Sequence, residues 1–439
     1  MDSPYSRHRQ DSMSSPDSAY WPLDQFVLDP GYLAYREELR HLIFNTAQTA
    51  APTRQGSPLD MFDSQGTFAI QVPLLARHCP ALLCALLALS ARQMERKEGR
   101  QHSFDSLELY QDAIRHLNPL LQAQARDHTG NDGGENDDAR QGDGGNVGNH
   151  LVIVPICVIL CCLEMMSASP RDWRRHLEGC ATLFEAFGVN GFSGDILQSV
   201  FWCYARMDLC GALISDGTQA TLVPTHKFLL PGMDNDDGPS LFSQHRSPDM
   251  HANYAVYLCS LVCELIADRT RHTEMGENNG CDAATFDRRW LRLWHLLQDW
   301  VRHRPADLVP LKSIETRPFP QILFAHWAAI SSHQLYHTAC ILLLSSVPHN
   351  LTAPDLGLTG SPIWHAKRIC GISLTNPHQG CLNNAIQPLW IAGRLLSHRS
   401  EHLLLVELIR SIESMTGWAT SWRISDLEAA WGYKISTGD

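Results

Sequence analysis

Apolar side chains recur along this chain mostly at three- and four-residue spacing, which is the period of an amphipathic helix. The segment that follows Leu107 shows this period, with Tyr110, Ile114, Leu117 and Leu121 on one face. Runs that alternate apolar and polar residues, as strands do, are scarce. The pattern therefore predicts an all-α fold.

A unit between residues 170 and 207 predicts a helix hairpin. Pro170 suits the first position of a helix, and Asp172 lies in the first turn, where the helix dipole favours an anion. One apolar stripe then follows the helix period and consists of Trp173, Leu177, Cys180, Ala181 and Phe184. Glycines interrupt the pattern at Gly188, Gly191 and Gly194. A second helix is expected from Asp195, and such hairpins are the unit of α-solenoid folds.

Further helices are expected along the rest of the chain. The longest apolar run, 151–163, is shorter than the ~20 residues that cross a bilayer, so we expect a buried helix and no membrane partner. Helical periods also occur at 254–267, 286–301 and 321–347. Near the end, a helix is expected to finish at Gly417 in the left-handed conformation. A last short helix is expected from Ser425, with Glu428 at capping-box spacing.

Polar stretches without a helical period separate these helices. Residues 127–149 are rich in glycine and acidic side chains, and they cannot offset the entropy of ordering, so we expect a disordered surface loop. Residues 1–22 are expected to form a flexible tail and residues 23–435 a helical domain. Residues 232–250 are again polar and turn-rich, and they mark a candidate subdivision of that domain.

Composition narrows the class of protein. The chain has 439 residues, a hydrophobic fraction of 44% and a formal net charge of −12. Without a dense cationic block, tight phosphate binding by this chain alone is disfavoured. Its 14 cysteines lie mostly in apolar helical stretches, which is typical of reduced thiols in an intracellular protein. The first 20 residues lack the apolar core of a signal peptide.

Several segments, in their order along the chain, resemble one family. These are PLLARHCPALLCALLALSARQM, CCLEMMSASPRDWRRHLEGCATLFEAFG, FWCYARMDLCGALISDGTQATL and the closing ESMTGWATSWRISDLEAAWGYK. Together they resemble the fungal-specific transcription factor domain, the regulatory domain of zinc binuclear cluster transcription factors. The resemblance covers roughly residues 23–433. It implies an all-α, multi-helix, α-solenoid-like regulatory domain built of helix hairpins with disordered insertions.

The resemblance also implies a function. It points to a nuclear regulator of transcription that controls genes of specialised metabolism, nutrient use or stress response. The expected partners are other transcription regulators or a second copy of the chain, with a small-molecule effector as a further candidate. No cofactor is expected in this chain, and the resemblance assigns no effector-contacting or DNA-contacting residues.

The zinc cluster of such proteins is absent from this sequence. Cys79 is the first cysteine, and no paired C-x-x-C spacing with basic residues precedes it. Either a six-cysteine module is encoded upstream, or a partner supplies the contact with promoter DNA. The alternative function is therefore an adaptor or co-regulator that does not bind DNA itself and acts only through protein contacts.

Two sets of residues have the chemistry of metal ligands. The first set is Cys161, Cys162, His176 and Cys180, and the second is His326, His333 and His337. The cysteine pair lacks the usual loop between ligands, and no glutamate lies between the last two histidines as a zinc protease requires. We therefore favour buried thiols in packed helices for the first set, a polar stripe facing a neighbouring helix or a cavity for the second, and no metal.

Arginines and tryptophans alternate in residues 288–302, as they do on surfaces that bind single-stranded nucleic acid. The residues are Arg288, Trp290, Arg289, Arg292, Trp294, Trp300 and Arg302. Helical spacing favours another interpretation, because Trp290, Leu293, Trp294, Leu297 and Val301 share one apolar face and leave the arginines to solvent.

No sequence motif indicates an enzyme. The chain contains no G-x-S-x-G elbow, phosphate-binding P-loop or G-x-G-x-x-G after a strand. We therefore assign no catalytic residues and expect no enzymatic activity.

Overall fold

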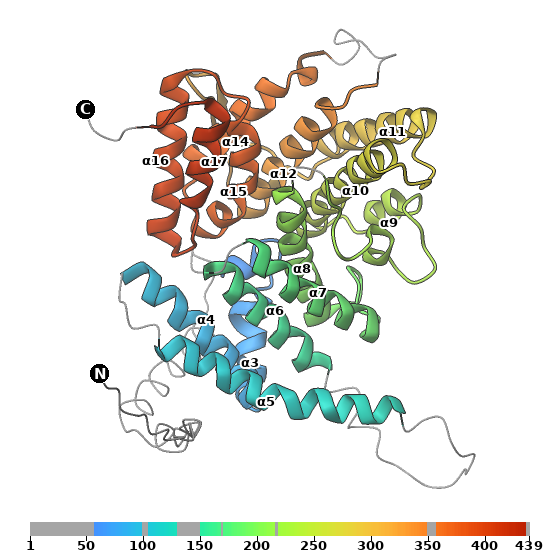
Figure 1. Cartoon of the computed structure of the whole chain (residues 1–439), viewed down its shortest axis with the longest axis vertical. Helices are drawn as coiled ribbons and strands as arrows, with labels where there is room; N and C mark the ends of the chain where they lie inside the picture. Colours follow the sequence, from blue (N-terminus) through green and yellow to red (C-terminus); the bar gives the residue numbers. More distant parts are fainter. Residues whose placement is uncertain are drawn as a thin grey trace, which may run out of the picture.

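Helices form nearly all of the regular structure (Figure 1), which confirms the all-α prediction. The computed structural model describes residues 57–98, 104–129, 150–167, 170–215, 218–348 and 357–435. The predicted tail, residues 1–22, lies outside the described residues. So do residues 130–149 of the predicted acidic loop.

The N-terminal half contains two long helices that pack against each other, a buried helix and the predicted helix hairpin. Its helices are α3 (Val72–Ala76), α4 (Pro80–Glu98), α5 (Phe104–Thr129), α6 (His150–Ser167), α7 (Pro170–Phe187) and α8 (Asp195–Ile214). Helix α4 packs against α5 and α6, and α6 packs against α7 and α8. The hairpin α7–α8 begins each helix where the sequence predicts, and the Tyr204 hydroxyl of α8 donates to the Leu177 carbonyl of α7 at 2.9 Å.

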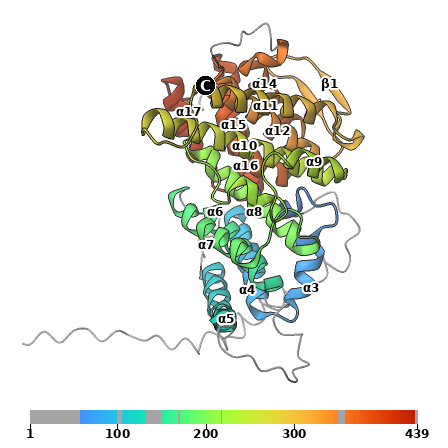
Figure 2. The same cartoon turned by 90° about the vertical axis from the view of Figure 1, so that its right-hand side faces the viewer.

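The C-terminal half surrounds a central helix. Its helices are α9 (Gly238–Gln244), α10 (Pro248–Glu274), α11 (Ala283–Arg302), α12 (Trp327–Leu344), α14 (Pro362–Thr375), α15 (Gln379–Gly393), α16 (Arg399–Thr416) and α17 (Trp422–Trp431). Every residue of α12 after Trp327 is buried, because α10, α11, α14 and α15 pack around it. Figure 2 shows this half above the N-terminal helices.

Buried apolar side chains form one continuous cluster that runs from Met61 to Ile435. The cluster crosses residues 232–250, where α9 places Leu241 and Phe242 in the core. This polar stretch is therefore partly helical, and its apolar side chains pack in the core. The subdivision of the domain near it stays a prediction.

A short hairpin precedes α12 and corrects the predicted helix at 321–347. Strand β1 (Lys312–Ile314) pairs antiparallel with β2 (Gln321–Leu323). The amide of Asn376 donates to the Ile322 carbonyl at 2.7 Å, and the Ile322 N–H donates to the Thr375 hydroxyl at 3.3 Å. These side chains from the end of α14 take the backbone groups that a helix would use, so the helix begins only at Trp327.

The chain end follows one prediction and departs from another. Gly417 ends α16 with a φ of 77°, as predicted for a left-handed cap. The last helix, however, begins at Trp422 and not at Ser425. The Glu413 carboxylate of α16 accepts hydrogen bonds from the N–H groups of Thr420 and Ser421, at 3.3 and 2.8 Å, and so starts the helix earlier.

Helix α5 buries a different face from the predicted one, and helix α10 has the length and hydropathy of a membrane-spanning helix. In α5 the fully buried apolar positions are Leu109, Ala113 and Leu117, one position away from most of the predicted stripe, and the helix continues to Thr129. Within the described residues, α10 contains an 18-residue stretch that is apolar enough to cross a bilayer. However, 83% of that stretch is buried inside the protein. The run 151–163 lies in α6 and is largely buried, as predicted.

Candidate functional site

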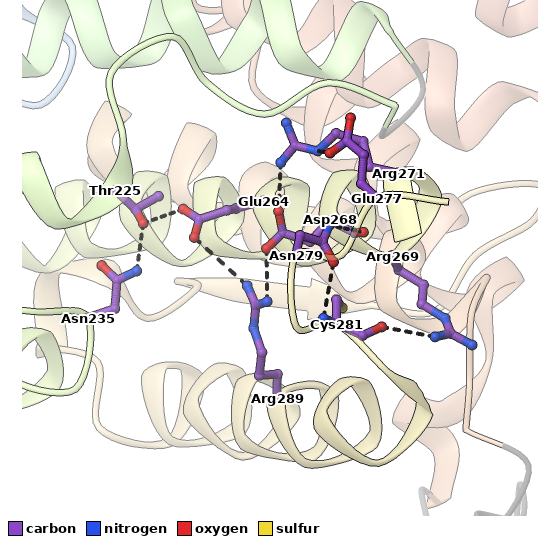
Figure 3. A network of polar contacts seen from close by, with 10 residues as sticks. All are labelled: Thr225, Asn235, Glu264, Asp268, Arg269, Arg271, Glu277, Asn279, Cys281 and Arg289. Carbon is purple, nitrogen blue, oxygen red and sulfur yellow. Dashed lines mark hydrogen bonds and ion pairs between the residues drawn. The ribbon is translucent and has the colours of Figure 1, made fainter. Parts of the chain in front are cut away.

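Two polar stretches far apart in the sequence converge on the paired helices α10 and α11 (Figure 3). Glu264 and Asp268 lie one turn apart on α10, and Arg289 of α11 reaches both of them. Its Nη1 lies 2.8 Å from the Asp268 carboxylate, and its Nη2 lies 3.8 Å from the Glu264 carboxylate. This guanidinium is the centre of the polar network.

On one side the network holds the segment that follows α8. Thr225 is fully buried, and its hydroxyl donates to the Glu264 carboxylate. The same hydroxyl accepts a hydrogen bond from the Asn235 amide at 2.8 Å, and the Asn235 carbonyl accepts one from the Tyr257 hydroxyl at 3.0 Å. The first residue of η3 (Thr225–Phe228) and Asn235, which follows η3, are thereby tied to α10.

On the other side the network holds the loop between α10 and α11. The Asn279 amide donates to the Asp268 carbonyl at 2.7 Å, and its own carbonyl accepts from the Cys281 N–H at 3.1 Å. Arg271 bonds the Asp268 carboxylate at 2.7 Å and pairs with Glu277 at 3.7 Å. Figure 3 shows that Asn279 and Arg271 both meet Asp268, so side chains hold this loop against α10.

The network matches its charges internally. Arg289 meets two carboxylates and Asp268 meets two guanidinium groups, so each charge has an opposite neighbour. These side chains are partly exposed, and ion pairs of that kind stabilise a fold by only about 0–1 kcal/mol each. The network therefore holds two loops in place on one face of the domain.

The candidate stacking surface of residues 288–302 is not a surface for bases. Trp290, Trp294 and Trp300 are buried, and the indole N–H groups of Trp290 and Trp300 each donate to a backbone carbonyl at 2.9 Å. Trp300 takes the buried position expected for Val301, which is half-buried.

The arginines of the same helix have partners within the protein. Arg289 and Arg292 pair with carboxylates outside α11, and Arg302 bonds Asp299 one turn earlier at 2.6 Å. Arg288 donates to the Thr285 hydroxyl at 3.3 Å. This face therefore offers little unpaired positive charge for phosphate.

The structure separates the three candidate histidines of α12. His326 precedes the helix as its N-terminal cap, where its Nδ1 accepts from the Ala328 N–H at 3.3 Å. His333 and His337 lie inside the core. Burial lowers the pKa of His333 to about 3, and burial followed by the proximity of His365 lowers the pKa of His337. Both imidazoles are therefore neutral at physiological pH.

His337 faces α14, where it meets His365, a residue that sequence spacing did not bring into the set. The two Nδ1 atoms lie 2.7 Å apart, and His365 Nε2 lies 2.8 Å from the Thr359 carbonyl. A carbonyl only accepts, so His365 donates from Nε2 and accepts at Nδ1, and His337 donates from Nδ1. This assigns one tautomer to each neutral ring.

The four candidate ligands around α6 and α7 do not converge. The thiol of Cys180 lies beside that of Cys161, whereas Cys162 lies near Cys203 of α8. His176 points to Glu164, with 4.0 Å between its Nε2 and the carboxylate. In the part of the chain that the structure describes, no three His, Cys, Asp or Glu side chains are grouped as metal ligands.

One cysteine and histidine pair, which sequence reasoning did not select, has the contact of a catalytic dyad. Cys381 Sγ lies 3.5 Å from His378 Nδ1 at the start of α15. Cys381 is fully buried, however, and burial raises the pKa of its thiol to about 12. A nucleophilic cysteine needs a lowered thiol pKa and access to substrate, so this pair lacks both requirements.

Comparison with known proteins decides the family. The fungal specific transcription factor domain matches residues 57–431, which include almost every described residue. The chain belongs to this family. Both halves of the molecule, the polar network and the central helix α12 all lie within this fungal transcription factor domain.

A curated relative of the domain carries a functional name. The chain is 21% identical to the transcription activator AMTR1 of Alternaria alternata, over 85% of this chain and 61% of that protein. The chain thus spans less than two thirds of the length of the relative it matches. No solved structure matches the chain.

The closing segment of the fungal transcription factor domain joins distant helices. The Ala419 N–H donates to the Met166 carbonyl of α6 at 3.2 Å. The Arg423 guanidinium lies between the rings of Trp390 and Trp422, 4.0 and 4.2 Å from their centroids. These contacts place the segment across the junction of the two halves, and the cation–π geometry stabilises it there.

Proposed function

We propose that this chain is the regulatory part of a nuclear transcription regulator that controls a gene set in specialised metabolism, nutrient use or stress response. The observation that carries the proposal is the match of the fungal transcription factor domain to residues 57–431. The name of the relative, a transcription activator, supports the same function.

In this proposal the helical domain works through its contacts and not through catalysis. Its partners are other transcription regulators or a second copy of the chain, and a small molecule modulates it without a bound cofactor. The internally paired arginines of α11 support indirect contact with promoter DNA, because paired guanidinium groups bind phosphate poorly. Direct contact then requires a zinc cluster encoded upstream of this sequence, and indirect contact requires a partner that supplies the DNA-binding part.

The buried polar groups support a regulator over an enzyme. The neutral histidines of the core and the fully buried Cys381 are closed to substrate, and the exposed charges of the network neutralise one another. These are the features of a scaffold that holds surfaces in place.

Chromatin immunoprecipitation of the tagged protein, expressed from its own locus, tests the proposal. We expect enrichment at promoters whose transcripts change when the gene is deleted, together with nuclear fluorescence of the tagged protein. A cytoplasmic protein with no promoter enrichment and an unchanged transcriptome would contradict it.

A binding assay with purified chain separates the two forms of the proposal. An enriched promoter that the purified 439-residue chain also binds indicates direct recognition. A promoter that is enriched in cells but not bound by the purified chain indicates an adaptor that reaches DNA through a partner, provided that the transcript of the tagged locus encodes no six-cysteine module upstream of Met1.

A further inference from the structure

The hairpin β1–β2 leaves one edge of its sheet open. Strand β2 lies against the end of α14, where Thr375 and Asn376 bond the backbone of Ile322, so that edge is covered. Strand β1 forms the other edge, and all three of its residues are exposed. Figure 2 shows β1 at the outer rim of the C-terminal half. An exposed edge of this kind is a template for pairing with another extended chain.

The open edge presents the backbone of Ser313. This residue lies opposite Ile322 in the register of the two strands. The N–H and the carbonyl of Ile322 both bond side chains of α14, so the backbone groups of this pair point away from each other and those of Ser313 point outward. Among the described residues, no group bonds the Ser313 N–H or carbonyl. One donor and one acceptor are therefore available to a further strand.

Exposed apolar side chains gather around this edge. In the part of the chain that the structure describes, four of the eleven exposed large apolar side chains lie within residues 309–323, namely Val309, Leu311, Ile314 and Leu323. Leu311 is the most open of the four, at 67% exposed. Contiguous exposed apolar side chains mark surfaces of protein contact, so the hairpin has the character of a docking surface.

A hollow of about 460 Å³ continues this surface beyond β1. It begins at Thr316, two residues after the end of the strand, and its walls include Pro318, Leu374 and Leu404. A strand advances about 3.3 Å per residue, so a chain paired with Ser313 reaches the hollow within a few residues. The hollow can therefore hold an apolar side chain of the same extended segment.

The charges of the surface decide which kind of segment fits. Lys312 lies in β1 and Arg317 in the wall of the hollow, and neither pairs with a carboxylate of the described residues. Glu315, between them, is paired with Arg368 at 2.7 Å. A second copy of the chain paired at Ser313 would place the Lys312 side chains of both copies on one face of the shared sheet, where like charges repel. An acidic segment gives both cations a counter-charge.

We propose that β1 binds an extended segment of a partner protein that carries both apolar and acidic side chains. The backbone of the segment pairs with Ser313 and adds a third strand to the hairpin. Its carboxylates contact Lys312 and Arg317, and its apolar side chains cover Leu311 and Ile314 and enter the hollow. The surface follows from the hairpin alone and does not depend on the transcriptional role.

Fluorescence anisotropy with the purified 439-residue chain tests the proposal. The probe is a fluorescein-labelled peptide of three Leu-Leu-Asp-Asp repeats, which as a strand places leucine and aspartate alternately on each face, as Lys312 and Ile314 alternate on β1. We expect saturable binding of this peptide, and about tenfold weaker binding of the matched peptide with lysine in place of aspartate. No saturable binding, or equal binding of the two peptides, would overturn the proposal.

Two substitutions at Ser313 locate the contact. Ser313→Pro removes the outward N–H but no hydrogen bond of the hairpin, and proline is tolerated at such edge positions, so the Tm should stay close to that of the wild type. We expect its affinity for the aspartate peptide to fall about tenfold, because the added strand loses a main-chain hydrogen bond. Ser313→Ala keeps the N–H and is the matched control, with unchanged affinity. A folded proline variant that binds as tightly as the wild type would contradict the proposal.

Hydrogen exchange of the wild-type chain gives a readout that needs no variant. Addition of the aspartate peptide should slow amide exchange within residues 309–316, because pairing protects the Ser313 N–H. Bound peptide without slower exchange there would place it elsewhere on the molecule and overturn the proposal, even if the proline variant fails to fold.

Lys312→Glu tests the charge. The side chain is exposed and lacks an ion pair, so the fold should be unaffected. We expect the aspartate peptide to bind about tenfold more weakly and the lysine peptide to bind more tightly than to the wild type. Unchanged affinities for both peptides would contradict the acidic partner.

Sedimentation of the chain without peptide tests the competing occupant. We expect the same sedimentation coefficient for the wild type and for Ser313→Pro. A dimer that the proline substitution converts to a monomer would show that a second copy covers the edge, and would overturn the proposal.

Discussion

Helices α11 and α12 pack against each other but bury their polar residues in opposite ways. Helix α11 is amphipathic, with its tryptophans in the core and its arginines paired near the surface. Helix α12 is buried on every side, and it carries His333, Gln334 and His337 into the core. The Gln334 amide donates to the Ser373 hydroxyl at 2.8 Å, and His337 meets His365.

The difference teaches where polar groups affect stability most. A charge at the surface loses little when its partner is removed, because water replaces that partner. A buried polar group has no such replacement, so the loss of its partner costs the full desolvation free energy. Substitutions in the core should therefore cost more free energy of unfolding than substitutions in the surface network.

Trp290→Ala tests the apolar face of α11 and should be the most damaging change. The ring is fully buried, and its N–H bonds the Leu343 carbonyl at the end of α12. We expect the free energy of unfolding to fall by about 3–5 kcal/mol, because the substitution leaves a large cavity. Urea unfolding measures it, and Leu291→Ala on the exposed side of the same helix is the control, with a change within about 0.5 kcal/mol.

His337→Leu tests the buried polar face of α12. The substitution removes the donor to His365 and leaves a buried acceptor unpaired. We expect a loss of about 1–3 kcal/mol in urea unfolding. His295→Leu, on the exposed side of α11, should change stability by less than about 0.5 kcal/mol. Equal effects of the two substitutions would mean that the histidine pair contributes nothing to stability.

Acid should weaken the fold through the same buried rings. The pKa of His333 is about 3 and that of His365 about 4 in the folded protein, against 6.5 for an ordinary histidine. Their lowered pKa means that unfolding takes up protons below pH 6.5. Each ring's contribution is thus complete above that pH and falls by about 1.4 kcal/mol per unit as the pH drops towards the folded value.

Comparison of the wild type with His333→Gln between pH 7 and 5 measures this contribution. The difference in unfolding free energy between the two proteins should shrink as the pH falls. The buried carboxyls of Asp60 and Asp208, whose pKa values burial raises to about 7 and about 6, titrate in the opposite sense in both proteins. If the difference in unfolding free energy between the two proteins does not change with pH, the pKa of His333 in the folded protein is not lowered.

Arg289→Ala, at the surface network of α11, should have a smaller effect than the substitutions in the core. Loss of the pairs with Glu264 and Asp268 should cost about 1 kcal/mol or less at low salt, and less still at 0.5 M salt, at about a 4 Å screening length. Arg302→Ala, which loses a more exposed pair, is the control and should change stability least. A salt-independent loss of several kcal/mol would place Arg289 among the buried groups.

Sequence periodicity predicted α11 well because that helix has one apolar and one polar face. It misplaced the start of α12, because the strand β2 depends on Thr375 and Asn376, more than 50 residues away along the chain. It did not identify α14, nor α15, which is buried on most sides and therefore lacks a polar face. Gly371 permits close approach of α14 to the Pro320 carbonyl, a contact that no local pattern reveals.

The candidate site was predictable only in its parts. Helical spacing places Glu264 and Asp268 on one face of α10, and the arginines of α11 on the other side of its tryptophans. The contacts of Glu264 and Asp268 with Arg289 require the packing of α10 against α11. Their contacts with Thr225 and Asn279 also require the two loops to lie against α10.

The sequence by itself determined the helical class, the hairpin α7–α8, the left-handed end at Gly417 and the family. These follow from residues within a few turns of one another and from segments whose order along the chain is recognisable. Only the packing of distant segments sets which polar side chains are buried and which of them find partners. Burial is a property of neighbours that are distant in sequence, and in the low-dielectric core it sets both the charge state and the free energy of each polar group.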